Sequence, residues 1–304
     1  MATDKRVDFD FEVDFANGGG IQGQEFRLDI NGDEIDDSEL ADYIVRDLRL
    51  LMVERVRILR KQIIHEQHKR GHHRPVEAAS RRRIMIDLSH EIYDGLVSVR
   101  GLPAPRIDAF LTRSASTAHY AAGTSFHIGQ VEMVANTGTY MDSPFHRYDA
   151  GTDLPDVSLA KLADLEGLVV RVAGSHKRAI DRGVFVGSDV RGKAVLVDTG
   201  WAMHWQTPQY LDGYPFLTRS AAEYLRDEGA ALVGIDSPNI DDDADMSRPC
   251  HSILLGADVL IVEHLCRLGT LPIQGFSFTA VPAPIRGLGT FPVRAFATLS
   301  EAIH

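Results

Sequence analysis

Several features that would place a chain in a special class are scarce or missing here. Only two cysteines occur in 304 residues, which excludes a disulfide framework and indicates reduced thiols. No run of about 18 apolar residues is present, so no membrane-spanning helix is predicted. Net positive charge is also lacking, because a formal charge of −11 argues against a nucleic-acid partner. The first residues are charged rather than apolar, so we expect no secretory signal and a cytoplasmic location.

The overall composition is typical of a soluble globular protein. Hydrophobic residues make up 44% and charged residues 25%, and no internal repeat is visible. A chain of this length can bury a large core and can hold one or two domains. A basic stretch at residues 69–83 interrupts the patterning, so we place a domain boundary there. The predicted domains are residues 1–83 and 84–304.

The first thirty residues have the pattern of two strands. Apolar and acidic residues alternate strictly from Val7 to Phe15, which is typical of a half-buried strand. The glycines of residues 18–20 break the pattern, and the alternation resumes from Phe26 to Ile30. These residues predict an N-terminal β-hairpin, and its acidic face should discourage pairing with other chains.

A long helix is predicted next. Asp37 or Ser38 can serve as the N-cap, and no proline or glycine occurs from Leu40 to about His68. The apolar stripe along this helix requires a packing partner. Two partners remain open, namely a second copy of the chain, with the helix acting as a dimer arm, or the α/β body of the same chain.

From residue 84 onward the pattern indicates a mixed α/β domain. Buried strands are predicted at 167–172, 194–198, 231–235 and 257–265, and a helix at 220–228. Asp236, Asn239 and Asp241 follow one of these strands and are expected in a solvated loop, with the orientation of site residues as the alternative. Glu263 lies in an otherwise apolar strand, where its charge requires a partner such as a metal ion, Arg267 or a histidine.

The segment Asn136-Thr-Gly-Thr-Tyr-Met-Asp-Ser-Pro-Phe-His146 is the most informative part of the chain. It combines a glycine turn, a carboxylate and an imidazole, and Pro144 prevents a regular ladder between them. Such an irregular strand end can present metal ligands or acid/base groups. The spacing alone is equally compatible with a surface turn that contains a histidine.

This segment resembles the signature His-x-Gly-Thr-His-x-Asp-x-Pro-x-His of the cyclase or kynurenine formamidase-like family of metal-dependent hydrolases. Gly138, Thr139, Asp142, Pro144 and His146 match it in register. Asn136 and Tyr140 stand where the family has its first two histidines.

The resemblance covers roughly residues 84 to 299. It includes Ile86-Asp-Leu-Ser-His-Glu-Ile92 as an opening strand and Pro292-Val-Arg-Ala295 as a closing strand. His251 and Glu263 are spaced like a later ligand pair of the family. The resemblance implies a compact α/β body with a barrel-like mixed sheet, preceded here by the hairpin and the long helix. It also implies a homodimer or homotetramer.

The resemblance implies two divalent ions, usually zinc and in some members manganese. Asp142, His251 and Glu263 are retained as metal ligands, and His146 corresponds to the catalytic acid/base. The site of the first ion lacks both imidazole ligands. An asparagine amide and a tyrosine phenol are poor substitutes for them, so this site is not expected to hold an ion. One divalent ion is therefore expected, and the alternative is that none binds and Tyr140 acts with His146 as a catalytic pair.

The expected function is that of an enzyme, a hydrolase acting on a carbon–nitrogen or cyclic amide or ester bond of a small ring-bearing molecule. Water would be activated by the ion and protons moved by His146. Two alternatives stay open at this point. One is a metal-free cyclase or dehydratase that uses Tyr140 and His146, and the other is a catalytically silent oligomeric scaffold.

Overall fold

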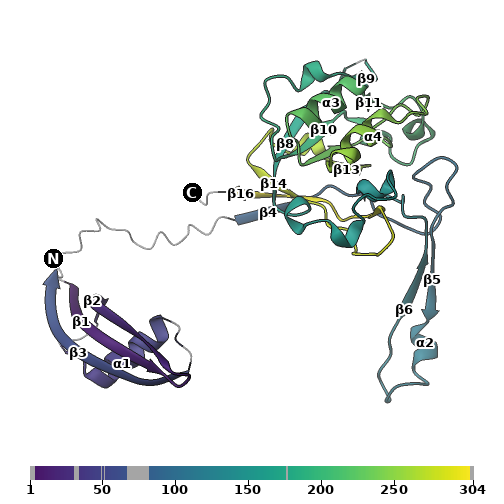
Figure 1. Ribbon diagram of the computed structural model, residues 1–304. Helices are drawn as coiled ribbons and strands as arrows, with labels where there is room; N and C mark the ends of the chain where they lie inside the picture. Colours follow the sequence, from purple (N-terminus) through teal and green to yellow (C-terminus); the bar gives the residue numbers. More distant parts are fainter. Residues whose placement is uncertain are drawn as a thin grey trace. The chain divides into compact units, whose positions relative to one another are not determined.

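The computed structural model describes residues 4–30, 34–48, 50, 52–66, 82–175 and 177–301. The chain divides into two compact units, Met1–Ala78 and Ala79–His304 (Figure 1). Most of the basic stretch expected between the domains lies outside the described residues. Among the helices described, none has the length and apolar character needed to cross a bilayer.

The N-terminal unit is an antiparallel three-stranded sheet covered by one helix. Strand β1 (Asp4–Phe15) lies in the centre, between β2 (Gly19–Asp29) and β3 (Val53–Glu66). The predicted hairpin is confirmed as the β1–β2 pair. Helix α1 (Asp37–Asp47) is capped by the Asp36 side chain, which accepts from the Glu39 N–H. Its apolar face packs on the sheet, in a core that includes Val7, Phe9, Phe11, Val13, Leu40 and Ile44.

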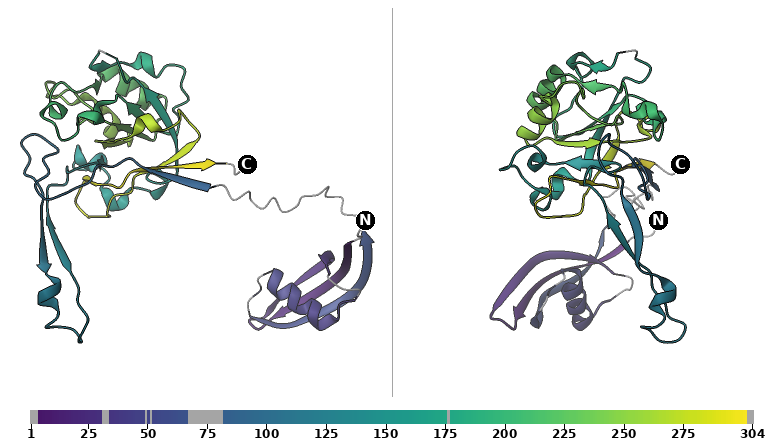
Figure 2. Two further views of the ribbon diagram at one scale, coloured as in Figure 1. Left: turned by 180° about the vertical axis from the view of Figure 1, so that it is seen from behind. Right: turned by 90° about the vertical axis from the view of Figure 1, so that its right-hand side faces the viewer.

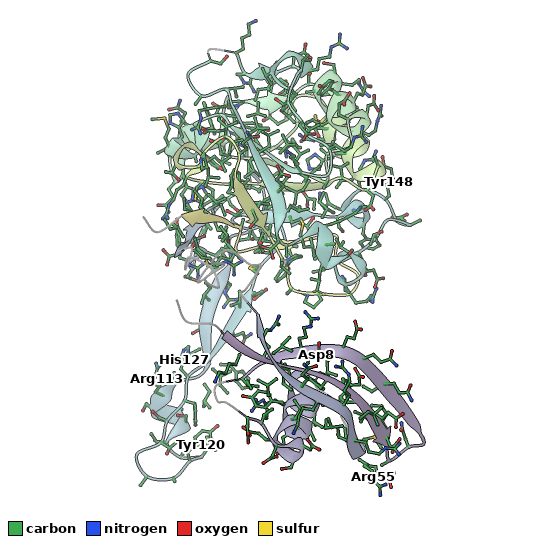
Figure 3. The ribbon with its side chains drawn as sticks, turned by 90° about the vertical axis from the view of Figure 1, so that its left-hand side faces the viewer. Asp8, Arg55, Arg113, Tyr120, His127 and Tyr148 are labelled. Carbon is green, nitrogen blue, oxygen red and sulfur yellow. The ribbon has the colours of Figure 1, made fainter. Side chains whose placement is uncertain are left out.

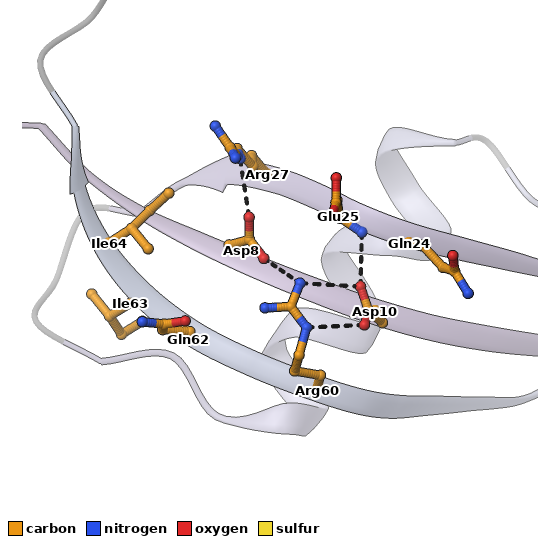
Figure 4. A pocket seen from close by; sticks show the side chains of 9 residues that line it. All are labelled: Asp8, Asp10, Gln24, Glu25, Arg27, Arg60, Gln62, Ile63 and Ile64. Atoms are coloured by element: carbon orange, nitrogen blue, oxygen red, sulfur yellow. Dashed lines mark hydrogen bonds and ion pairs between the residues drawn. The ribbon is translucent and has the colours of Figure 1, made fainter.

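The acidic residues of β1 lie on the other face of this sheet and pair with arginines of the flanking strands. Arg60 bonds to both Asp8 and Asp10, and Arg27 bonds to Asp8 (Figure 4). The hydrogen bond from Arg60 is the largest influence on both carboxyls, and it lowers the pKa of each. The acidic stripe is therefore balanced within its own sheet.

The prediction of a helix from Leu40 to about His68 was wrong. The helix ends at Asp47, and residues 53–66 form β3, which pairs with β1 along its length. This segment is rich in valine and isoleucine, which favour strands because their branched side chains pack well on a pleated surface. The second edge of β1 needed a hydrogen-bonding partner, and this tertiary requirement decided the conformation. Helix α1 accordingly packs on its own sheet.

The larger unit is built on a curled nine-stranded mixed sheet, which confirms the predicted α/β body with a barrel-like sheet (Figure 2). Four parallel strands form its centre, and antiparallel strands flank them on both sides. In sheet order the strands are β15 (Thr290–Pro292), β7 (Tyr140–Asp142), β13 (Leu260–Glu263), β12 (Leu232–Ile235), β10 (Ala194–Asp198), β8 (Leu165–Arg171), β14 (Phe276–Thr279), β16 (Phe296–Glu301) and β4 (Arg82–Asp87).

Apolar cores cover both faces of this sheet, because successive side chains of a strand point to opposite faces. One core includes Val195 and Val197 of β10 with helices α3 (Arg219–Asp227) and α4 (Pro249–Gly256). The other includes Leu196 of β10 with Phe276 and Phe278 of β14. The predicted central strands and the helix at 220–228 are thus confirmed within a few residues. The closing strand expected at Pro292–Ala295 is wrong, because β15 ends at Pro292 and β16 begins at Phe296.

A long hairpin extends from the body of this unit (Figure 3). It consists of β5 (Arg106–Leu111) and β6 (Ile128–Glu132), with helix α2 (Arg113–Ser116) in the connection. The labelled residues Arg113, Tyr120 and His127 lie along it. Several large apolar side chains of the hairpin are exposed, among them Phe110 at 74%, Val131 at 55% and Phe126 at 52%. The two short parallel strands β9 (Ala179–Ile180) and β11 (Phe216–Leu217) pair elsewhere in the unit.

Candidate metal and catalytic site

The short strand β7 organises the site, because both of its neighbours contribute polar side chains. In the antiparallel register Tyr140 lies opposite Glu263 of β13, and Asp142 lies opposite Thr290 of β15. Residues directly opposite each other on paired strands have side chains within contact distance. The signature segment is therefore joined to two segments more than 100 residues away.

Glycines allow the chain to turn tightly around this strand. Gly138 has a φ of 66°, a left-handed conformation that favours glycine. Gly289 precedes β15, and a Cβ there would lie only 2.1 Å from the backbone nitrogen of His146. Because glycine has no Cβ atom, β15 can lie close to the 3-10 helix Pro144–His146. The Thr290 hydroxyl is then 2.7 Å from Nδ1 of His146.

Asp241 positions the second imidazole of the site. Its carboxylate accepts hydrogen bonds from the backbone N–H groups of Cys250 and His251 at the start of α4. The same carboxylate lies 2.7 Å from Nδ1 of His251. A carboxylate at this distance favours the tautomer with hydrogen on Nδ1, which leaves Nε2 available as a ligand. The expectation of a solvated loop is thus wrong for Asp241, whose exposure is 0%.

Three side chains converge beside β7. Asp142, His146 and His251 each offer a ligand atom, and these atoms all lie within 4.8 Å of one another. Nε2 of His251 is 3.7 Å from Oδ2 of Asp142, and this oxygen is buried without a hydrogen-bond partner. A buried carboxylate oxygen without a donor is costly unless a cation or a water satisfies it. The side chain of His146 is 34% exposed, which keeps this cluster open to solvent.

Glu263 forms the other half of the site, together with the two residues that depart from the signature. Its Oε2 accepts from the Tyr140 hydroxyl at 2.6 Å, and its Oε1 accepts from the Ile240 N–H at 2.6 Å. A hydrogen bond from the Asn136 side chain also reaches Tyr140. Oε1 is in addition 3.7 Å from Nε2 of His251. Tyr140 and Asn136 thus form a neutral hydrogen-bonded arm on the Glu263 carboxylate.

Burial dominates the electrostatics of this arm. It raises the pKa of Glu263 to about 7, although the neighbouring His251 acts in the opposite direction. It also raises the pKa of Tyr140 well above 10, so the phenol stays protonated and donates its hydrogen. For Asp142, burial acts to raise the pKa as well. The imidazoles of His251 and His146 outweigh burial there and hold the pKa of Asp142 below its usual value.

The structure places all five predicted site residues around β7: Tyr140, Asp142, His146, His251 and Glu263. Sequence reasoning missed Thr290, which bonds to both Asp142 and His146. For Asp241 it considered a role in orienting site residues but preferred a solvated loop. A weak signal was available for Asp241, since a helix beginning at Pro249 needs acceptors for its first N–H groups. No comparable signal pointed to Thr290.

Known proteins resemble this chain in the larger unit, which contains the site. A family model described as a putative cyclase matches residues 86–242. The kynurenine formamidase of Geobacillus thermodenitrificans is 29% identical over 177 residues, which cover 58% of this chain and 81% of that protein.

Two solved structures share the fold. Isatin hydrolase A from Labrenzia aggregata, bound to benzyl benzoate, superposes with a TM-score of 0.61 at 18% identity. The match covers 74% of this chain and 96% of the hydrolase. A potential metal-dependent hydrolase with cyclase activity gives a TM-score of 0.59 at 23% identity, over 71% of this chain and 98% of its own.

Proposed function

This chain belongs to the putative cyclase family, and from that premise we propose that it is a metal-dependent hydrolase of an amide bond in a small ring-bearing molecule. The similarity to kynurenine formamidase and to the fold of isatin hydrolase supports this reaction class. The observation that carries the proposal is the unpartnered Oδ2 of Asp142 beside the ligand-ready Nε2 of His251.

The residues around this oxygen fit one divalent ion. Asp142 and His251 would hold it, with Oε1 of Glu263 as a third ligand atom 3.7 Å from the His251 nitrogen. A mixed imidazole and carboxylate set suits zinc or manganese. Such an ion would supply polarisation of the amide carbonyl and a water of lowered pKa. A second ion does not fit, because Tyr140 and Asn136 occupy the positions of its imidazole ligands.

His146 is the proposed acid/base. The Thr290 hydroxyl contacts both Asp142 and His146, and it has a single hydrogen to donate. Donation to the Asp142 carboxylate leaves the hydroxyl oxygen to accept from Nδ1–H of His146. Nε2 of the neutral ring is then free to take a proton from the attacking water and return it to the leaving nitrogen. The partial exposure of His146 gives that nitrogen access to substrate.

Tyr140 has a supporting part in this proposal. Its phenol donates to Glu263 and thereby satisfies a buried carboxylate oxygen. The hydrogen bond from the phenol favours the charged form of the Glu263 carboxylate, against burial, which raises the pKa of this group to about 7. Glu263 therefore keeps the orientation that a ligand of the remaining ion requires.

Metal analysis of chelator-free protein tests the proposal, beside hydrolysis of a simple formanilide. We expect about one divalent ion per chain, lost in Asp142→Asn and in His251→Gln, with activity that chelation abolishes. His146→Asn should keep the ion and lose hydrolysis. Loss of the ion in that variant would make His146 a ligand instead of the acid/base.

Other outcomes favour the alternatives. Hydrolysis or dehydration that survives chelation would support the metal-free pair of Tyr140 and His146. A protein that binds no ion after incubation with zinc or manganese, and turns over no amide, would contradict the proposal and leave a binding scaffold. Asp212→Asn, a surface variant on a carboxylate with 80% side-chain exposure, serves as the matched charge control.

We also propose that the chain assembles with copies of itself through the β5–β6 hairpin. A two-stranded hairpin alone is at best marginally stable in water. This one leaves Phe110, Phe126 and Val131 exposed, and exposed apolar surface of this kind is typical of an interface between subunits.

A further inference from the structure

A cavity of about 160 Å³ adjoins the candidate site and has an unusual lining. Its lining residues are His146, Arg147, Asn239, Arg248 and His251. Two of these belong to the proposed catalytic site, and two more are arginines. No carboxylate belongs to this lining, although the whole chain has a net charge of −11. The space next to the reacting groups is therefore lined by cationic and neutral side chains.

Both guanidinium groups are bonded only to neutral groups. Nη1 of Arg248 donates to the main-chain oxygen of Asp242 at 3.2 Å, and its side chain also bonds to Tyr214. Nε of Arg147 donates to the Ser252 hydroxyl, and its guanidinium lies 5.2 Å from the centre of the Tyr148 ring. Within the described part of the chain, neither arginine makes an ion pair with a carboxylate. Each keeps N–H donors for another acceptor.

Arg248 lines two neighbouring cavities. A second cavity, of about 130 Å³, shares Asn239 and Arg248 with the first and is also lined by Arg100 and Asp243. The acidic Asp243 lines this second cavity, whereas the two catalytic histidines line the first. Arg248 comes three residues before His251, with its backbone in a left-handed conformation at the start of α4. The fold thus places the Arg248 guanidinium in the wall of the same cavity as the two catalytic histidines.

We infer that Arg248, assisted by Arg147, binds a carboxylate of the substrate, so that the preferred substrates are anionic ring-bearing amides. A guanidinium meets a carboxylate with two parallel hydrogen bonds, which gives both affinity and orientation. With the carboxylate held there, the amide carbonyl of a small aromatic molecule can lie beside His146 and His251. This inference names the substrate class of the proposed hydrolase and rests on that function.

Binding of small probes tests the subsite without catalysis. Benzoate and benzamide have the same shape and differ in charge, and their affinities for the protein as purified can be measured by calorimetry. We expect benzoate to bind at least about tenfold more tightly than benzamide, since hydrogen bonds to charged groups are the strong ones. Arg248→Gln should remove this preference, and Arg248→Lys should restore only part of it. Arg182→Gln, on the exposed 3-10 helix Arg182–Val184, is the matched control and should leave both affinities unchanged.

Turnover separates the subsite from the reaction. With formanilide and its ortho-carboxylate, N-formylanthranilate, Arg248→Gln should raise KM for the carboxylate substrate several-fold more than KM for formanilide. Equal affinity for benzoate and benzamide, or a benzoate affinity that Arg248→Gln does not lower, would overturn the inference. The second result would place benzoate on the metal ion or elsewhere. Hydrolysis of neither substrate, with benzoate binding intact, would contradict the proposed function and leave the anion subsite standing.

Discussion

Asp241 offers the sharpest test of how the site is held together. Its carboxylate accepts three hydrogen bonds, from the N–H groups of Cys250 and His251 and from Nδ1 of the His251 ring. In Asp241→Asn the shape is nearly retained, but one oxygen becomes an NH2 group that cannot accept. At least one N–H group then loses its acceptor, and the negative charge that polarises the imidazole is lost.

The magnitude follows from these contacts. Removing the outer partner of a metal-ligating histidine typically costs about 10–100-fold in metal affinity, or roughly 1.4–2.7 kcal/mol. Loss of an acceptor at the start of α4 should also destabilise the fold by about 1–2 kcal/mol. We therefore expect Asp241→Asn to bind zinc about 10–100-fold more weakly while remaining folded.

Competition with a chromophoric chelator measures the affinity, and urea unfolding measures the stability. Asp242→Asn is the matched control, because it removes the same charge from the same loop. Its carboxylate lies 3.8 Å from Arg178 and accepts from the Ala244 N–H, and neither partner belongs to the site. An Asp241→Asn protein with unchanged metal affinity would refute the proposed orienting role. A loss of equal size in the Asp242→Asn control would attribute the effect to general loop charge.

Three further predictions follow from individual contacts. Tyr140→Phe leaves Oε2 of Glu263 without its donor, so the free energy of unfolding should fall by about 1–3 kcal/mol in urea titrations, with the single ion retained; unchanged stability would contradict the assigned hydrogen bond. Burial lowers the pKa of His264 to about 3 and of His90 to about 4, so the unfolded chain binds more protons than the folded one below pH 6.5. The contribution of these two histidines to stability should therefore be complete above about pH 6.5 and decrease as the pH falls toward 4. His264→Gln should accordingly reduce the change in the urea midpoint across this pH window. Phe110→Ser should shift the protein toward the monomer in light scattering at micromolar concentration, and an unchanged mass would contradict assembly through the hairpin.

The local patterns of the central strands determined much of the fold. Short apolar runs rich in branched residues, such as Ala194–Asp198, favour strands buried on both faces, and this segment is a buried strand in the structure. The β1–β2 pair was equally predictable from the sequence, because strict alternation of apolar and polar residues is typical of a strand and does not fit a helix. The conformation of residues 53–66 could not be predicted in this way. Its apolar residues suit either conformation, and only the free edge of β1 selected the strand.

For the candidate site, the sequence by itself determined which chemistry is possible. A signature with Asp142 and His146 retained, and with Asn136 and Tyr140 in place of two imidazoles, already limits the site to fewer ions than its family implies. The tertiary structure decided which distant residues complete it. Asp241 reaches the site through the start of α4, where His251 follows ten residues later. Thr290, and Glu263, which the resemblance already indicated, reach it through strand register with residues more than 120 positions away in the chain. Such pairings leave no mark in a single sequence, because hydrogen bonds between strands place no restriction on the residue types that they bring together.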